Sequence, residues 1–299
     1  MIDFVQNTVD GVMFGSSYAL LAIGFTIVFG VMRRINLAFG ASIMLGAYVG
    51  TWLHVNYDVH VLAVALTTVM STVLVGLYVE RLCFRAIRRD VALASMVSSF
   101  VIWMQLEEVA IHLLPERTYK FPNLFVTESF ELGPFLFRSE QTTMLLMAVC
   151  MVLILHFLLR HTKFGLALRA ISENPNAAVY MGINTALIMI CAFALVSVVG
   201  GVAGFAILTT DQQITPFFGL WATFKGLIAM MLGGMGSLRG AILGGLLLGI
   251  VEAHALWYLG NEYKDLSAYL LLFIMLILRP GGLLGKRILS REELVFRRV

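Results

Sequence analysis

The sequence predicts an all-α polytopic membrane protein with about eight or nine transmembrane helices, an amino terminus outside and a cytoplasmic carboxyl terminus. Three observations lead to this fold class. Hydrophobic residues make up 60% of the 299-residue chain and charged residues only 13%, which lies outside the range of soluble globular domains. Apolar stretches long enough to cross a bilayer recur along the chain. Basic residues gather in alternate connections between these stretches.

The transmembrane helices are predicted from the apolar stretches. A hydrocarbon core about 30 Å thick requires roughly 20 helical residues. The stretches that approach this length are residues 8–31, 37–55, 59–79, 91–114, 142–159, 186–208, 217–235, 240–259 and 267–278. The stretch 217–235 contains Lys225 and ends in a glycine-rich run, so we expect a broken or re-entrant helix buried in protein. We assign all the stretches to one domain, residues 1–299.

Small residues at four-residue spacing predict where helices touch, because they let helix backbones approach closely. They occur as Gly11, Gly15 and Ala19, as Ala38, Ser42, Gly46 and Gly50, as Gly200 and Gly204, as Gly240 and Gly244, and as Gly245 and Gly249. We interpret these sets as structural ridges.

The orientation follows from the basic residues, since cytoplasmic loops carry an excess of Lys and Arg. Alternate connections hold Arg33, Arg34, Arg81, Arg85, Arg88, Arg89, Arg160, Lys163, Arg169, Arg239, Lys286, Arg287, Arg291, Arg297 and Arg298. The other set, residues 1–10, 54–58, 115–141, 209–215 and 260–266, holds few basic residues, most of them offset by acidic ones. We predict that this second set lies outside, with a periplasmic loop at 115–141. The net charge of +3 then requires no nucleic-acid partner.

The cytoplasmic connection at residues 160–184 is too long and too ordered in its signals to be a simple linker. Asn174-Pro175 predicts a helix start, with asparagine as the N-cap and proline at the first helical position. Gly182 can take the left-handed conformation that ends a helix. A short, stiff helix at the membrane surface suits force transmission to a soluble partner, and an ordinary interfacial amphipathic helix is the alternative.

Several motifs in order carry a resemblance to a known family. They are Gly15-Ser16-Ser17-Tyr18-Ala19-Leu20-Leu21-Ala22-Ile23-Gly24, residues 29–40 with Leu45-Gly46-Ala47-Tyr48, Arg169-Ala170 with residues 173–178 and Met181-Gly182-Ile183-Asn184, and Lys225-Gly226-Leu227 with residues 233–241. Together they resemble the inner-membrane permease of the branched-chain amino acid (LIV-type) ABC importers, and in particular the permease whose amino terminus lies outside. Phe39 departs from the pattern, which has His in many members.

The resemblance implies a complex in the bacterial inner membrane. It would comprise this permease, a second homologous permease, two ATPase subunits and a periplasmic substrate-binding protein. The chain would be a transport subunit and not an enzyme. It would bind no cofactor, since ATP and magnesium would sit on the ATPases, and the sequence has no G-x-x-x-x-G-K-[ST] phosphate loop. The ATPase-coupling residues implied by the resemblance are Arg169, Glu173, Asn174, Pro175, Ala177, Ala178 and Gly182.

Polar residues inside the apolar stretches are candidates for the translocation path, because a charge at a helix centre costs about 2.5–3.5 kcal/mol on insertion scales. Gln105 and Glu108 share one helix face with His112, where a surface cluster is an equal interpretation. Glu252 lies deeper, and Lys225 could neutralise a buried partner. A structural ion pair is the alternative for Glu252.

Other functions remain open from the residues alone. Similar ABC permeases serve urea, short amides and other amino acids besides leucine, isoleucine and valine. An ion-coupled secondary transporter would use intramembrane charges as a relay, but such charges are sparse here. The sequence contains neither an H-E-x-x-H nor a G-x-S-x-G motif, either of which would favour a membrane enzyme. The isolated Cys83, Cys150 and Cys191 indicate no metal site.

Overall fold

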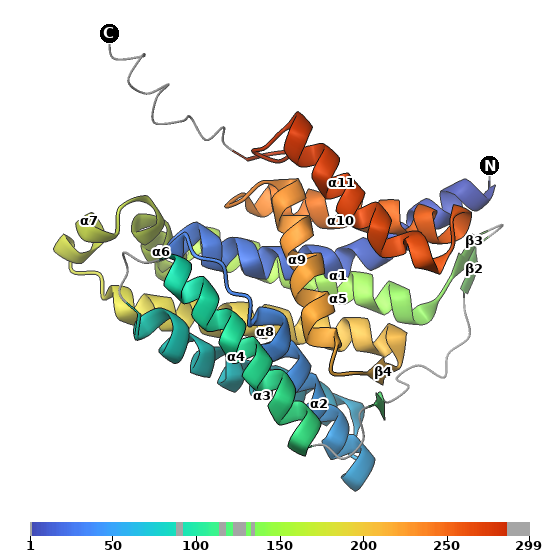
Figure 1. Cartoon of the computed structure of the whole chain (residues 1–299), viewed down its shortest axis with the longest axis horizontal. Coiled ribbons are helices and arrows are strands. Elements are labelled where there is room, and N and C mark those ends of the chain that lie inside the picture. Colours follow the sequence, from blue (N-terminus) through green and yellow to red (C-terminus); the bar gives the residue numbers. More distant parts are fainter. Residues whose placement is uncertain (1, 88–91, 114–117, 122–129, 133–134, 286–299) are drawn as a thin grey trace.

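The computed structural model describes residues 2–87, 92–113, 118–121, 130–132 and 135–285. Within these ranges the chain forms a bundle of helices with short strands at one end (Figure 1). The helices are α1 (Ile2–Met32), α2 (Phe39–Tyr57), α3 (Val61–Val79), α4 (Ala92–Leu113), α5 (Ser139–His161), α6 (Lys163–Glu173), α7 (Pro175–Tyr180), α8 (Thr185–Asp211), α9 (Phe218–Gly233), α10 (Leu238–Tyr258) and α11 (Lys264–Leu278). A π-helical turn, η1 (Glu80–Arg85), extends α3, and a 3-10 helix, η2 (Asn261–Tyr263), precedes α11.

Each of the nine predicted apolar stretches contains a helix, so the all-α prediction is confirmed. Among the described residues, six helical segments are long and apolar enough to cross a membrane: Ile2–Met32, Val61–Arg85, Leu93–His112, Ser139–His161, Thr185–Asp211 and Leu238–Tyr258. The other three, α2, α9 and α11, have 19, 16 and 15 residues. At 1.5 Å per residue α9 is only about 24 Å long, shorter than the hydrocarbon core of a bilayer. It is one continuous helix, so the broken helix expected at 217–235 is not found, and a re-entrant arrangement stays a prediction.

Helix α1 forms the centre of the bundle and packs along α10 (Figure 1). A Cβ placed on Gly11 would lie 2.6 Å from the Cα of Ile250, and one on Gly15 would lie 2.8 Å from the Cα of Leu246. From the other side, Gly245 and Gly249 abut the backbone of α1. The two predicted ridges therefore pack against each other, and only glycine leaves room for this contact.

A second contact region joins α2, α3 and α8. Gly46 and Gly50 of α2 abut threonines of α3, and Gly200 and Gly204 of α8 abut Phe39 and Ile43 of α2. Phe39, the residue that departs from the family pattern, is 3% exposed. Its ring meets that of Phe25 edge-on, with 5.0 Å between ring centroids. At this position the chain has a core packing residue.

The connections predicted to lie outside come together at one end of the bundle. The short strands β1 (Tyr119–Lys120) and β4 (Gln213–Ile214) pair antiparallel, and so do β2 (Phe130–Leu132) and β3 (Phe135–Phe137). Gln6 of α1 donates a hydrogen bond from its Nε2 to the Leu136 carbonyl oxygen at 2.9 Å. These strands are a small addition to the predicted all-helical fold, and they tie the amino-terminal segment and two distant connections into one surface.

Candidate functional site

The segment between α5 and α8 forms the helix, break and helix that the sequence predicts. Thr162 begins α6, because its Oγ1 accepts a hydrogen bond from the Gly165 N–H at 3.2 Å. Asn174 begins α7, and its Oδ1 accepts from the N–H groups of Asn176 and Ala177, both at 3.1 Å. Pro175 occupies the first helical position. These side-chain caps satisfy donors that a helix start would otherwise leave free.

The end of α7 is also fixed. Gly182 has φ +81°, a left-handed conformation, and the Ile183 N–H donates to the Ala178 carbonyl oxygen at 3.0 Å, which closes the helix end. The Asn184 Oδ1 then accepts from the Leu187 N–H at 3.1 Å and starts α8. Ala178 is buried. A helix of only six residues is thus held at both ends and can act as a rigid body.

Helix α7 projects from one end of the molecule (Figure 1) and exposes an apolar tip. Tyr180 is 91% exposed, Met181 80% and Val179 51%. Sequence reasoning named the capping residues around this tip but missed the tip itself. Its only signal was three large side chains directly before Gly182, since a two-turn helix is too short for a hydrophobic period to define a face.

Basic residues from separate connections meet next to this segment. A cavity of about 940 Å³ is lined by Arg33 after α1, by Arg160 and Arg169 of α5 and α6, and by Arg239 of α10. Glu173, the other predicted polar contact of the coupling segment, also lines it. Arg34 is buried and donates to the Ser95 Oγ at 2.6 Å. Arg88, Arg89 and the predicted basic carboxyl terminus lie outside the described residues.

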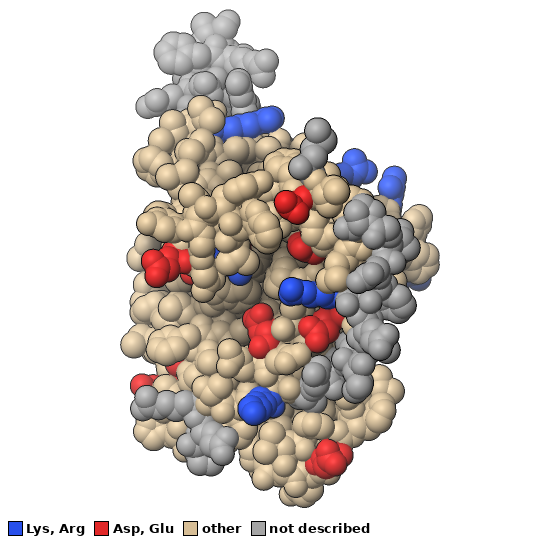
Figure 2. Space-filling model, turned by 90° about the vertical axis from the view of Figure 1, so that its right-hand side faces the viewer, with Lys and Arg blue, Asp and Glu red and all other residues tan. Residues whose placement is uncertain are grey.

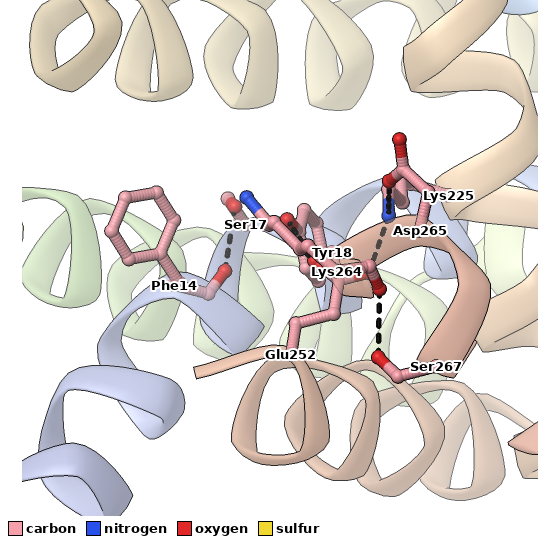
Figure 3. Close-up of polar contacts among 8 residues, drawn as sticks. All are labelled: Phe14, Ser17, Tyr18, Lys225, Glu252, Lys264, Asp265 and Ser267. Carbon is pink, nitrogen blue, oxygen red and sulfur yellow. Dashed lines mark hydrogen bonds and ion pairs between the residues drawn. The ribbon is translucent and has the colours of Figure 1, made fainter. Parts of the chain in front are cut away.

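The structure joins two of the predicted path residues in a buried ionic cluster (Figure 3). Lys225 of α9 and Glu252 of α10 form a salt bridge, and their side chains are 4% and 2% exposed. The Lys225 Nζ also lies 2.7 Å from the Asp265 Oδ1 at the start of α11. The Tyr18 hydroxyl of α1 donates to the Glu252 Oε2 at 2.8 Å. The cluster therefore ties four helices together, and burial of paired charges explains how they are tolerated inside the bundle.

Sequence reasoning did not identify Tyr18 and Asp265 as partners in this cluster. Tyr18 lies within a nearly continuous apolar run, and Asp265 falls in the segment predicted to be an outer connection. Only the folded arrangement of α1 and α11 brings them to Glu252 and Lys225. The rings of Tyr18 and Trp221 each lie with their centroid 6.0 Å from the Lys225 Nζ, a contact that further stabilises the ammonium group.

The other two predicted path residues lie elsewhere. Gln105 and Glu108 occupy an exposed face of α4. Gln105 accepts a hydrogen bond from the Tyr78 hydroxyl at 3.3 Å, and Glu108 pairs with His112 at 3.4 Å, with side chains 68% and 77% exposed. These contacts agree with a surface cluster, which was the equal alternative for this helix face. A role of Gln105 and Glu108 in the translocation path stays a prediction.

Tyr18 and Glu252 also line a second cavity, of about 520 Å³. We call it the amino-terminal cavity, since Asp3, Asn7 and Asp10 of α1 line it, together with Arg138 and Gln141. Figure 2 views the molecule from the end that carries the amino terminus and shows a hollow bordered by both acidic and basic side chains. The two cavities lie on different parts of the chain, the first around the carboxyl end of α1 and the second around its amino end.

Comparison with known proteins gives a consistent result over nearly the whole chain. Residues 7–278 match the family model described as the permease component of the branched-chain amino acid transport system. The chain is 32% identical over 298 residues to the high-affinity branched-chain amino acid transport system permease protein LivH of Escherichia coli K12, covering 95% of this chain and 96% of LivH. It is 30% identical over 295 residues to BraD of Pseudomonas aeruginosa, with the same coverage.

A solved structure shares the fold. PsaBC from Streptococcus pneumoniae in complex with Fab matches with a TM-score of 0.51 at 13% identity, covering 93% of this chain and 92% of that chain. The match to the family model extends from α1 through α11. The chain therefore belongs to the branched-chain amino acid transport permeases and is a multi-pass membrane permease, the non-catalytic transport subunit of an ABC transport system.

Proposed function

We propose that this chain forms half of the translocation path of an ATP-driven importer for leucine, isoleucine and valine in the bacterial inner membrane. The relatives LivH and BraD are named for branched-chain amino acid transport, which supports this substrate class. A permease of this kind works with ATPase and substrate-binding subunits. We infer two ATPases that carry ATP and magnesium, a second homologous permease and a periplasmic binding protein.

The observation that carries the coupling role is the rigid, capped α7 with its exposed apolar tip. Val179, Tyr180 and Met181 have exposed side chains at the end of a helix that is capped at both ends. Large apolar side chains in water are typical of surfaces that bind a partner. A rigid helix can transmit the movement of an ATPase to α5 and α8 without bending, and Arg169 and Glu173 supply charges beside it.

The orientation in the membrane follows from charge. Arg33, Arg160, Arg169 and Arg239 line one cavity, and the excess of basic residues at that end supports a cytoplasmic location. Helix α7 then faces the ATPases, and the amino terminus and the paired strands face the periplasm. Within the part of the chain that the structure describes, helices α1 to α5 and α8 to α11 are then embedded in the membrane, with α2, α9 and α11 as the shorter ones.

The proposal is tested by purifying the tagged chain from its native membranes and identifying what accompanies it. Tyr180→Ala combined with Met181→Ala removes the two most exposed side chains of the apolar tip and leaves the capping side chains of α7 intact. We expect the wild type to copurify with two ATPases and a second permease, and the variant to lose the ATPases while it keeps the second permease.

Tyr57→Ala provides the matched control. Tyr57 is also a largely exposed tyrosine, at 67%, but it lies at the end of α2 beside Asp58, away from α7. This variant should copurify with the ATPases as the wild type does. Recovery of the chain alone, with uptake that needs no ATP, would contradict the proposal and favour an ion-coupled transporter. Labelled urea and acetamide in the same uptake assay distinguish the other substrates.

A further inference from the structure

The amino-terminal cavity contains two buried polar groups that lack a hydrogen-bond partner among the described residues. Asn7 is 8% exposed and Gln141 3%, and both line the cavity. The Asn7 Nδ2 has no acceptor and the Gln141 Oε1 has no donor within the part of the chain that the structure describes. Buried polar groups in proteins are nearly always satisfied, so these two indicate a missing partner that both accepts and donates.

The charges around the cavity are of both signs. Asp3 and Asp10 contribute carboxylates from α1, and Arg138 and Lys264 contribute positive charges from the connections before α5 and at the start of α11. Glu252 is already paired with Lys225 and Tyr18 and lies 3.9 Å from the Lys264 Nζ. A purely anionic or purely cationic ligand would be repelled by part of this lining. A zwitterion has a positive group that the carboxylates attract and a negative group that the Arg and Lys side chains attract.

The remaining wall is apolar. Phe14, Leu136, Leu256 and Trp257 line the cavity beside the polar groups. The volume of about 520 Å³ lies within the usual range for small-molecule sites, about 300–1,000 Å³. An aliphatic side chain of a few carbons fits this combination of apolar wall and polar groups.

We propose that the amino-terminal cavity binds a zwitterionic α-amino acid with an aliphatic side chain, directly on the permease. The carboxylate of the amino acid is the acceptor that Asn7 lacks, and its ammonium group is the donor that Gln141 lacks. The inference rests on the proposed function, because it assigns to this chain a binding site for the substrate class of the importer. Selection of the substrate would then occur twice, on the soluble binding protein and again at this cavity.

The experiment measures binding of labelled L-leucine to the purified transporter in lipid nanodiscs, without binding protein and without nucleotide. We expect saturable binding that L-valine and L-isoleucine compete for. Leucinol, which lacks the carboxylate, and 4-methylpentanoate, which lacks the ammonium group, should compete poorly. Competition by both of these analogues as strongly as by L-valine would overturn the zwitterion assignment.

The variants Gln141→Leu and Asn7→Leu test the two amides. Each replaces an unpartnered polar group by an apolar one of similar size, which should leave the fold as stable as before or more stable. We expect each to weaken leucine binding at least about tenfold, as loss of a hydrogen bond to a charged group does. Gln213→Leu, at an exposed position of β4 that does not line the cavity, is the matched control and should bind leucine as the wild type does.

The assay separates this inference from the proposed function, since it requires neither ATP nor the ATPases. If the wild type imports leucine with ATP but both variants bind and import it unchanged, the cavity is not the site and the importer stands. If the transporter binds leucine through Asn7 and Gln141 but shows no ATP-driven uptake, the site stands and the importer fails.

Discussion

The contact between α1 and α10 predicts that alanine at Gly15 destabilises the protein, although alanine is the better helix former. A Cβ at Gly15 would lie 2.8 Å from the Leu246 Cα and 2.9 Å from the Gly245 carbonyl oxygen. Both neighbours are backbone atoms, so neither can rotate away as a side chain could. Restoring an ordinary contact requires the two helices to separate by about 1 Å, which loosens the tight packing along the whole interface.

Gly30 provides the matched comparison within the same helix. A Cβ there would have its nearest neighbour at 4.0 Å, the Gly236 Cα. Both Gly→Ala changes gain about 0.5–1 kcal/mol of helix propensity, but only Gly15→Ala also incurs overpacking of about 1–3 kcal/mol. The propensity gain is common to both variants, so Gly15→Ala should be less stable than Gly30→Ala by about 1–3 kcal/mol.

The free energy of unfolding is measured for both variants by titration of the detergent-solubilised protein with SDS, followed by circular dichroism. Gly30→Ala should be as stable as the wild type or slightly more so, and Gly15→Ala clearly less. Equal stability of the two variants would refute the close approach of α1 and α10.

Two further predictions follow from the buried cluster and from α7. Lys225→Met leaves Glu252 charged and buried, with Lys264 as its remaining cation at 3.9 Å, and should lower the free energy of unfolding in the same titration by about 3 kcal/mol, the lower end of the range for a broken buried pair. Adding Glu252→Leu should recover most of this loss, and a double variant as unstable as the single one would argue against the pair. Gly182→Val forces a branched residue to φ +81°, where nothing lies within 4 Å of the added Cβ. The variant therefore introduces backbone strain alone, of about 1–2 kcal/mol. This strain should distort α7 and reduce the amount of leucine imported per ATP hydrolysed. Gly260→Val, at φ +97° and equally uncrowded, introduces the same strain at the opposite end, and its import per ATP should remain that of the wild type.

Local signals in the sequence were sufficient for the helices and for the caps of α7. Asn174, Pro175 and Gly182 act on their own neighbours, so their roles can be predicted without knowledge of the fold. The glycine ridges predicted that helices touch but not which ones, because the pairing of Gly15 with α10 depends on the arrangement of the whole bundle.

The candidate sites required the folded structure to a larger extent. Lys225 and Glu252 could be named because charges in apolar stretches stand out, whereas Asp265 reaches them from a segment that reads as a connection. The roles of Asn7 and Gln141 depend on groups that are absent around them, and sequence alone gives no signal for an unsatisfied hydrogen bond. The tip of α7 was missed because exposure of three adjacent side chains is a property of how the helix projects.

The most direct test of the proposed function is uptake of labelled leucine into proteoliposomes that contain the purified complex, with the binding protein on the side of the amino terminus and ATP on the side of α7. Our account predicts uptake against a gradient that requires hydrolysable ATP and that is lost when Tyr180 and Met181 are replaced by alanine. Uptake that proceeds without ATP, or that is unchanged when the tip of α7 is removed, would contradict it.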